Sequence, residues 1–402
     1  MKGNERNSMR PRNIRIIDAD AIRQNMVLLR GAVPRSAEIM AVVKADGYGH
    51  GAVTAARAAL SGGASALAVA TAEEGIELRQ AGITAPILVL GAADREGAEA
   101  AARSDLTMTV CSPEMVRLCQ SAAEQAAARK GKPETVKVHL KVDSGMGRLG
   151  VRSLTERESV LEAISECRLV QLTGAYTHFS DADGNAEGEI YSEEQFRRFL
   201  TLTEGLRVPR HCANSAAALR HPEWALDMVR EGISLYGYPP VETGLGLKPC
   251  MEWRAKISYV KEVPPGEYIS YGRTFRTDRQ TRIATITCGY GDGYHRSAGG
   301  QAEVLIRGRR ARILGRICMD QMMADVTEIP EAKEEDPVIL LGEDGGERIS
   351  AEDLARWSGT ISYEILLSSG KRVIRTEKTK AAEDAGQRIC TGVRKEPTDK
   401  TE

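Results

Sequence analysis

The feature that most constrains this chain is a regular alternation of short apolar runs with longer amphipathic stretches between residues 38 and 232. The intervening stretches, such as Ala72–Ala81 and Ser112–Lys130, are typical of helices. A repeated β/α unit with eight strands predicts the α/β class and a closed TIM-type barrel, (β/α)8, and an open doubly wound sheet is the alternative. The eight runs are EIMAVVK (38–44), ALAVAT (66–71), PILVLG (86–91), LTMTVC (106–111), VKVHLKVD (136–143), LTGAYTH (172–178), PRHCAN (209–214) and LDMVREG (226–232).

The texture of the sequence changes after Gly237. The glycine-rich stretch TGLGLKP (243–249) is typical of a linker. The runs beyond it alternate, are rich in Val and Ile, and predict a mostly β domain, in which VLIRGRRARIL (304–314) forms a hairpin. Two short helices should follow, one after Ser350 as N-cap and one around Tyr363–Ser368.

These patterns divide the chain into two domains and two flanking segments. We expect a barrel domain and a C-terminal β domain, preceded by a disordered N-terminus and followed by a charged, largely disordered tail. The predicted bounds are 1–12, 13–242, 243–376 and 377–402.

Composition excludes several classes of protein. Lys and Arg total 55 against 56 Asp and Glu, a net charge of −1, which argues against a nucleic-acid binder held by bulk charge. No stretch approaches a membrane span, and Met1–Arg12 lacks the apolar centre of a signal peptide. The 8 Cys form no C-x-x-C pair and the 6 His no H-x-x-x-H pair. We therefore expect a cytoplasmic protein with free thiols and no metal site.

Lys44 is the first residue that needs a chemical explanation. It ends the first apolar run, at the carboxyl-terminal mouth where barrel active sites lie. The loop ADGYGHG (45–51) follows, and its glycines allow a tight, close-approach turn that brings Tyr48 and His50 beside the amine. Such a lysine could form a Schiff base with a carbonyl cofactor. The alternative is a solvated lysine that merely ends the strand.

The fifth run carries a second anomaly. In VKVHLKVD, three polar residues including His139 and Lys141 share one face, although a parallel barrel strand should be apolar on both. Lys141 is therefore expected to point into the barrel mouth and to need a partner, for which Asp143 and Arg148 are the nearby candidates. A plain Lys141–Asp143 ion pair without a catalytic role is the alternative.

The last three runs end in residues suited to an anion. His178 ends the sixth run, although a core histidine is the commoner case. Asn214 and Ser215 follow the seventh run, and Arg230 with Gly232 and Ile233 ends the eighth. The loops after strands 7 and 8 form the usual phosphate site of this fold. Lys44 opposite a phosphate site would fit a phosphorylated aldehyde such as pyridoxal phosphate (PLP).

In the second domain, tyrosines lie beside glycines in ISYGRTF (269–275) and CGYGDGYHR (288–296), and RICMDQ (316–321) and TISYEI (360–365) add Asp320 and Tyr363. For any one of these tyrosines, a half-buried packing role is the alternative to a functional one.

Taken together, these segments resemble the alanine racemase family of PLP enzymes over residues 13–375. The motifs that carry the resemblance, in the family's order, are AVVKADGYGHG, KVDSGMGRLG, THF, ANS, REGISLYG, SYGRTF, GYGDGYHR, GRICMDQ and TISYE. The resemblance implies a PLP-binding barrel, a β domain that the first strand (13–18) joins, and a head-to-tail homodimer. It implies interconversion of L- and D-alanine, which supplies D-alanine for peptidoglycan.

The resemblance also implies the residues that hold the cofactor and move the proton. Lys44 carries PLP and takes the α-proton from the D-isomer, and Tyr271, donated by the other subunit, takes it from the L-isomer. Arg230 faces the pyridine nitrogen and His178 lies beside the ring. The residues implied around the phosphate are Tyr48, Asn214, Ser215, Gly232, Ile233 and Tyr363.

A second implied set concerns the substrate. Arg148 and Met319 contact the substrate carboxylate, Met319 through its backbone N–H. Lys141 matches a position that is often carbamylated and then anchors that arginine, and Asp320 has a supporting role. The residues implied for the entrance passage are Asp183, Tyr290, Arg296, Arg316 and Ile361.

Arg230 is the best discriminator of reaction type in the sequence. An arginine is always charged, so it donates to the pyridine nitrogen and leaves it unprotonated. An aspartate there would hold the proton and make PLP a stronger electron sink. The weaker sink suppresses transamination, which suits a racemase.

The chain departs from the family's common pattern in three places. The lysine loop reads ADGYGHG where Ala-Asn-Ala-Tyr is commoner, Gly291 stands where alanine is usual, and Arg-Val-Ile-Arg (372–375) replaces Arg-Val-Pro-Arg. None of these replaces a matched catalytic residue.

Three rival functions remain. A serine or broad-spectrum racemase would differ in its pocket, which Tyr363 and Met319 crowd in favour of alanine. A PLP-dependent decarboxylase should have an acidic partner for the ring nitrogen where Arg230 stands. A non-enzymatic PLP-binding protein of this kind has a single domain, without the β domain and Tyr271.

Overall fold

The computed structural model describes residues 11–130 and 135–378. It divides into two compact units, one of residues 19–250 and one of residues 1–18 with 251–402, and each is described by itself. The second junction follows Cys250, where the sequence predicted a boundary at 242. In the described residues, no helix is long and apolar enough to cross a membrane.

The first unit is a parallel barrel. Its strands are hydrogen-bonded in the order β8-β7-β6-β5-β4-β3-β2-β9, and every pair is parallel. Backbone bonds from Asp227 N to Arg210 O (3.2 Å) and from Arg230 N to Ala213 O (3.0 Å) connect the two ends of that order. All eight predicted runs are strands, so the barrel is confirmed and the open sheet is wrong. The strands are β2 (Glu38–Val42), β3 (Ala66–Val69), β4 (Ile87–Val89), β5 (Thr107–Val110), β6 (Val136–Lys141), β7 (Val170–Tyr176), β8 (Arg210–His211) and β9 (Met228–Glu231).

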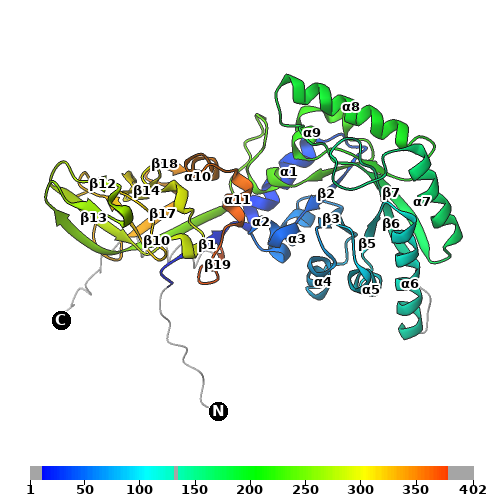
Figure 1. Cartoon of the computed structure of the whole chain (residues 1–402), viewed down its shortest axis with the longest axis horizontal. Helices are drawn as coiled ribbons and strands as arrows, with labels where there is room; N and C mark the ends of the chain where they lie inside the picture. The colour runs from blue at the N-terminus through cyan, green and yellow to red at the C-terminus, as the bar shows by residue number, and fades with distance from the viewer. Residues whose placement is uncertain (1–10, 131–134, 379–402) are drawn as a thin grey trace, which may run out of the picture. The chain divides into compact units, whose positions relative to one another are not determined.

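Helices cover the outside of the barrel (Figure 1). Strands β3, β4 and β5 are buried along their whole length, which explains why those runs are apolar on both faces. Helix α4 begins at a capping box in which Thr71 and Glu74 satisfy each other's backbone groups. The helical segments are α1 (Ala19–Ala32), α2 (Lys44–Tyr48), α3 (Ala52–Ser61), α4 (Ala72–Gln80), α5 (Arg95–Arg103), α6 (Pro113–Lys130), α7 (Leu154–Glu166), α8 (Ala186–Leu202), α9 (Ser215–Arg220), η1 (Pro222–Trp224) and η2 (Ile233–Tyr236).

The second unit is mostly β. Strand β1 pairs antiparallel with β10 and parallel with β19, so the first strand joins this unit's sheet. Strands β14 and β15 form the predicted hairpin, with Ile306 opposite Arg309. Its strands are β1 (Ile14–Ile17), β10 (Met251–Val263), β11 (Tyr268–Ile269), β12 (Phe275–Arg276), β13 (Thr281–Ile286), β14 (Glu303–Ile306), β15 (Arg309–Arg312), β16 (Met322–Asp325), β17 (Pro337–Asp344), β18 (Glu347–Ile349) and β19 (Ile374–Glu377).

The helical segments of this unit also follow the sequence. Ser350 caps α10 as expected, since its Oγ accepts from the N–H of Asp353 at 3.1 Å. Val263, Ile269, Ile283 and Leu314 form a buried apolar cluster. The helical segments are η3 (Tyr271–Arg273), η4 (Tyr290–Asp292), η5 (Arg296–Ala298), α10 (Ala351–Ser358) and α11 (Ser362–Leu367).

The flanking segments differ from expectation where the structure describes them. Arg12 was assigned to a disordered N-terminus, but it is ordered: its carbonyl accepts from Thr287 Oγ1 at 2.9 Å. Glu377 was assigned to the tail, but it ends β19, because pairing with β1 extends the sheet to this residue. The remaining parts of these two predictions, 1–10 and 379–402, lie outside the described residues.

Candidate active site

Lys44 lies where β2 gives way to a turn with an unusual backbone. Ala45, Asp46 and Tyr48 all have φ between 51° and 53°, in the left-handed region, with Gly47 at 61° between them. Non-glycine residues adopt this region at a cost of roughly 1 kcal/mol each, and such strain gathers at functional sites. The turn is closed by bonds from Gly47 N to Val43 O and from Gly49 N to Ala45 O. The tight loop predicted from the glycines is therefore confirmed.

The Lys44 amine lies in a positively charged, poorly hydrated place. Burial lowers the pKa of Lys44 below its ordinary value, and the positive charges of Arg148 and Arg230 lower it further, while Glu74 opposes them. Glu74 is itself engaged, because it accepts from the N–H groups of Ala45 and Ala70 at 2.6 Å. A lysine with a lowered pKa has more of the neutral amine that acts as nucleophile or base.

Arg230 projects from β9 into the barrel and is held by acceptors. Its Nη1 donates to the backbone O (3.1 Å) and Nδ1 (3.0 Å) of His211. Its Nη2 donates to Thr177 O at 2.7 Å, to Cys212 O at 3.0 Å and to His178 Nδ1 at 3.3 Å. Burial lowers the pKa of Arg230 to about 10, so the group stays charged at neutral pH. In the described part of the chain, its Nε–H has no protein acceptor.

The histidines around Arg230 are neutral. Burial and the charge of Arg230 lower the pKa of His178 and of His211 well below the ordinary value. Because His211 accepts from Arg230 at Nδ1, its proton is assigned to Nε2, which lies 3.1 Å from Nδ1 of His139. Arg230, His211 and His139 thus form a hydrogen-bonded row that keeps the only positive charge on the arginine.

Behind this row lies Tyr176, a residue that the sequence reasoning did not assign to the site. Its ring stacks on His211 with centroids 5.0 Å apart, and the cations of Lys141 and Arg230 lie 5.2 and 5.5 Å from its centroid. His211 was also missed. The one signal was the alternation of the predicted run LTGAYTH (172–178), which puts Tyr176 on the same face as His178.

Lys141 points into the barrel, as predicted, and the ion pair with Asp143 that was the alternative does not form. The amine donates to Val142 O at 2.7 Å, whereas Asp143 accepts from the N–H groups of Gly145 and Gly147, each at 3.0 Å. An aspartate satisfies nearby backbone donors in such a turn more easily than a group across the strand. Burial, then the charge of Arg230, lower the pKa of Lys141 to about 7, with Asp143 opposing.

Gly232 directly follows β9 and lies beside two hydroxyl groups. The N–H of Gly232 donates to Ser215 Oγ at 2.9 Å. A Cβ on Gly232 would lie 3.0 Å from Tyr48 Oη and 3.8 Å from Ser215 Oγ, so the glycine leaves space between two hydroxyls. Ile233 begins η2 next to it, and Asn214 caps α9 by accepting from Ala217 N at 3.0 Å. Hydroxyls and backbone N–H groups around such a space fit a phosphate group.

The other predicted site residues lie in the β unit, except Arg148 and Asp183, which are both exposed in the barrel unit. Tyr271 follows Ser270, whose φ is 68°, and its side chain is 69% exposed. Ser270 Oγ bonds to the carbonyl of Arg316, so this turn and the 316–320 turn are neighbours. Four further side chains in this unit are exposed, namely those of Tyr290, Met319, Asp320 and Ile361. Arg296 begins η5, and Tyr363 lies on α11.

Comparison with known proteins assigns both units to one family. The family described as "Alanine racemase, N-terminal domain" matches residues 17–240, and "Alanine racemase, C-terminal domain" matches residues 250–377. The alanine racemase of Halothermothrix orenii is 42% identical over 90% of this chain and 96% of its own length. That of Desulforamulus reducens is 43% identical over 89% of this chain and 97% of its own.

Solved structures agree. The alanine racemase of Bacillus anthracis, with bound L-Ala-P, aligns with a TM-score of 0.83 at 37% identity and covers 92% of this chain and 96% of its own. The enzyme of Streptomyces lavendulae aligns at 0.85 with 36% identity, over 94% of this chain and 99% of its own. With matches across both units and nearly the whole length of these relatives, this chain belongs to the alanine racemase family.

Proposed function

We propose that this chain interconverts L- and D-alanine with pyridoxal 5'-phosphate, and that it supplies D-alanine for peptidoglycan. The observation that carries the proposal is Arg230: a buried guanidinium whose Nη atoms are fully engaged while its Nε–H has no protein acceptor among the described residues. A ring nitrogen is the acceptor that suits it. The space between Tyr48 and Ser215 beside Gly232 supports a phosphate at the other end of the same ligand.

The residues of this chain would hold the cofactor from three directions. Lys44 would carry it covalently, Arg230 would bind its ring nitrogen, and His178 would lie beside its ring. Its phosphate would be held by Tyr48, Asn214, Ser215, Gly232, Ile233 and Tyr363. When bound, PLP supplies an electron-withdrawing ring that makes the Cα–H bond of an amino acid acidic.

Arg230 would direct the reaction toward racemisation. Its pKa of about 10 means that it keeps its own proton and only donates a hydrogen bond at Nε. The neutral state of His178 and His211, caused by burial and by this arginine, leaves them without the acidic second proton of an imidazolium. The chain therefore does not protonate the ring nitrogen, which disfavours the side reaction of transamination.

Racemisation needs a base on each face of Cα. Lys44 would be one, because burial and two neighbouring arginines lower its pKa and increase its neutral fraction. Tyr271 would be the other. It is exposed and lies in a different unit from Lys44. We propose that a homodimer forms and that each site takes Tyr271 from the partner subunit.

The remaining predicted residues would handle the substrate. Arg148 and the N–H of Met319 would bind the carboxylate, with Asp320 supporting the latter. Lys141 has a pKa of about 7, so much of it is neutral and its amine could add to CO₂, losing a proton to form a carbamate that anchors Arg148. The residues proposed for the entrance are Asp183, Tyr290, Arg296, Arg316 and Ile361. The cytoplasmic location remains a prediction, which cell fractionation checks.

Exchange of the α-proton in D₂O tests this function. The holoenzyme should exchange the α-proton of both alanine isomers and interconvert them, and should act far more slowly on serine. Exchange that retains configuration would contradict the two-base proposal. Release of CO₂ would indicate a decarboxylase, and equal rates on many amino acids would indicate a broad-spectrum racemase.

A further inference from the structure

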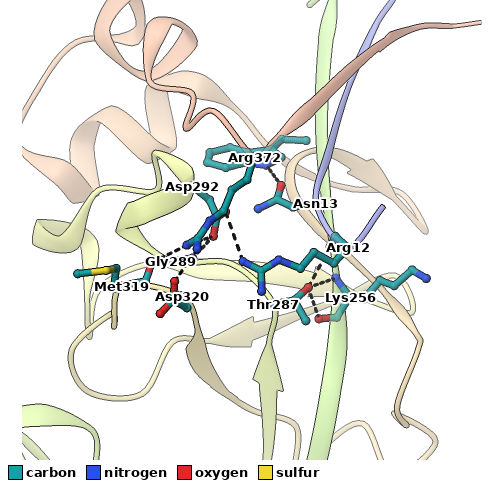
Figure 2. Close-up of polar contacts among 10 residues, drawn as sticks. Arg12, Asn13, Lys256, Thr287, Gly289, Asp292, Met319, Asp320 and Arg372 are labelled. Carbon is teal, nitrogen blue, oxygen red and sulfur yellow. Dashed lines mark hydrogen bonds and ion pairs between the residues drawn. The ribbon is translucent and has the colours of Figure 1, made fainter. Parts of the chain in front are cut away.

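Asp292 is a fully buried carboxylate in the β unit on which both ends of that unit's chain converge. It accepts from the N–H of Gly289 at 3.0 Å and from Nε of Arg372 at 2.7 Å. The guanidinium of Arg12 lies 3.7 Å from the same carboxylate. Figure 2 shows Arg12 and Arg372 approaching Asp292 from different segments. The η4 turn is thereby fixed by charge-assisted hydrogen bonds, which are stronger than neutral ones.

Arg372 continues from Asp292 to the neighbouring turn that carries Met319. Its Nη1 lies 2.7 Å from Asp320 Oδ1 and its Nη2 donates to the carbonyl of Met319 at 3.3 Å (Figure 2). The same carbonyl accepts from the N–H of Gly291 at 2.8 Å. The carbonyl of Met319 thus accepts two hydrogen bonds, which fix its position. In the part of the chain that the structure describes, the N–H of Met319 donates to no protein atom.

Gly291 leaves the room that Arg372 occupies. A Cβ at this position would lie 2.7 Å from Nη2 of Arg372 and 3.0 Å from the carbonyl oxygen of Met319. The φ of Gly291 is not in the left-handed region, so an alanine could adopt the backbone. The arginine tip would have to move, and the Met319 carbonyl would have to give by a few tenths of an ångström. The size of residue 291 therefore controls where the guanidinium lies.

We propose that Arg372 is a positioning residue that holds the Met319 peptide so that its N–H can bind the substrate carboxylate. This inference rests on the proposed role of Met319 in substrate binding. Its physical basis is the planar fork of arginine, which reaches two carboxylates and a carbonyl at once, as lysine cannot. Both Arg372 and Asp320 are about half exposed. An exposed ion pair adds little to the free energy of unfolding, so we expect this pair to affect the position of the Met319 peptide more than the stability of the fold.

The test compares Arg372→Ala, Arg372→Lys and Gly291→Ala, each as holoenzyme. Gly31→Ala, which adds a methyl group where nothing lies within 4 Å, is the matched control. Three quantities are measured: KM and kcat for alanine, the thermal unfolding midpoint, and the dissociation constant of propionate from a spectroscopic titration. Propionate has the carboxylate and methyl of alanine but no amino group, so its binding reports the carboxylate contact without turnover.

Loss of a charge-assisted hydrogen bond network should raise KM and the propionate dissociation constant about tenfold in Arg372→Ala, with kcat changed less than about threefold. Gly291→Ala should raise both by about threefold at an unchanged unfolding midpoint, since it displaces Nη2 without removing charge. Arg372→Lys should restore part of the affinity. Gly31→Ala should leave both values unchanged.

Two results would overturn the proposal. One is unchanged propionate binding in Gly291→Ala and Arg372→Ala. The other is a fall in kcat and in unfolding midpoint at constant KM, which a purely structural role would give. If Arg372→Ala does not fold, Gly291→Ala decides. A wild-type chain that does not racemise alanine would refute the proposed function alone, because the propionate titration still measures what Arg372 does.

Discussion

At the scale of single residues, Arg230 is held in place by many hydrogen bonds and has a clear proposed role, binding the ring nitrogen of the cofactor. A guanidinium at β9 is surrounded by three backbone carbonyls and two histidine nitrogens, so neither a carboxylate nor a lysine can replace its contacts. A buried site of this kind is costly unless every partner is satisfied. Its retention in this chain therefore needs a chemical reason, which the ring nitrogen of the cofactor supplies.

Arg230→Glu tests that reason. Alanine racemisation should fall by a factor of about 10² or more, because several hydrogen bonds to a charged group are lost at about 1.5–3 kcal/mol each. The fraction of turnovers that yield pyruvate should rise, since a carboxylic acid can protonate the ring nitrogen. Chiral chromatography together with a pyruvate assay measures both. An unaltered product ratio at a measurable rate would show that Arg230 does not set the reaction type.

His139 gives a prediction for stability against pH. Burial lowers the pKa of His139 to about 4 from 6.5, so the folded chain binds fewer protons than the unfolded chain between these values. The free energy of unfolding should therefore fall as the pH drops from 7 to 4, by about 3 kcal/mol from this residue. His139→Gln should flatten this dependence. Urea unfolding across that range measures it, and an equal slope in both proteins would contradict the assignment.

The sequence could predict those site residues that differ sharply from their neighbours. Lys44 and Lys141 are charged residues at the ends of apolar runs. Lys141 is buried, as the pattern indicated, and Lys44 is half-buried near Arg148 and Arg230. The row from Arg230 through His211 to His139 could not be predicted, because it joins three strands whose side-chain directions depend on barrel closure. Asp143 was misassigned because its partners are backbone N–H groups, which the sequence does not display.

At the scale of elements, the alternation of apolar residues predicted the positions of the strands well but their ends poorly. The run PRHCAN contributes only Arg210–His211 to β8, because Asn214 is needed to cap α9 directly afterwards. The lysine loop shows the same limit. Its glycines predicted a tight turn, but not that Ala45 and Asp46 adopt the left-handed conformation too. Both residues are exposed, so the hydrogen bonds that close the turn, and not packing of their side chains, outweigh their local preference.

Helix α10 offers a test at this scale. Ser350→Ala removes both the acceptor for Asp353 N and the hydroxyl that donates to Asp353 Oδ2, so the helix should lose about 1 kcal/mol. Amide hydrogen exchange in α10, measured by mass spectrometry, should become about fivefold faster. Ser159→Ala in α7 is the control, because its hydroxyl only contacts Thr155 O within the helix. Equal protection of α10 in both variants would be evidence against the cap.

At the scale of the whole molecule, the chain separates its proposed bases between two units. Lys44 belongs to residues 19–250 and Tyr271 to the β unit. The proposed homodimer gives each Lys44 the Tyr271 of the partner subunit, so activity should require association. The two-domain prediction came from the change in sequence pattern after Gly237. No pattern within one chain could show that the Tyr271 beside a given Lys44 comes from the partner subunit.

Complementation tests the shared site. Lys44→Ala and Tyr271→Phe should each be nearly inactive as pure proteins, whereas subunit exchange between them should restore activity. A mixed dimer has one site with both residues intact and one with neither, so an equal mixture should approach a quarter of wild-type activity, since half the dimers are mixed. Lys44→Ala mixed with Lys44→Ala, Tyr271→Phe should stay inactive. No recovery after subunit exchange would contradict the donated tyrosine.

The proposed function depends above all on Lys44 as the residue that carries the cofactor. The most direct measurement is borohydride reduction of the yellow holoenzyme, followed by proteolysis and mass spectrometry. Reduction should remove the yellow colour and leave the mass of the reduced cofactor on the peptide that contains Lys44, with no label in Lys44→Ala. Label on Lys141 or on any other lysine, or no label at all, would contradict it.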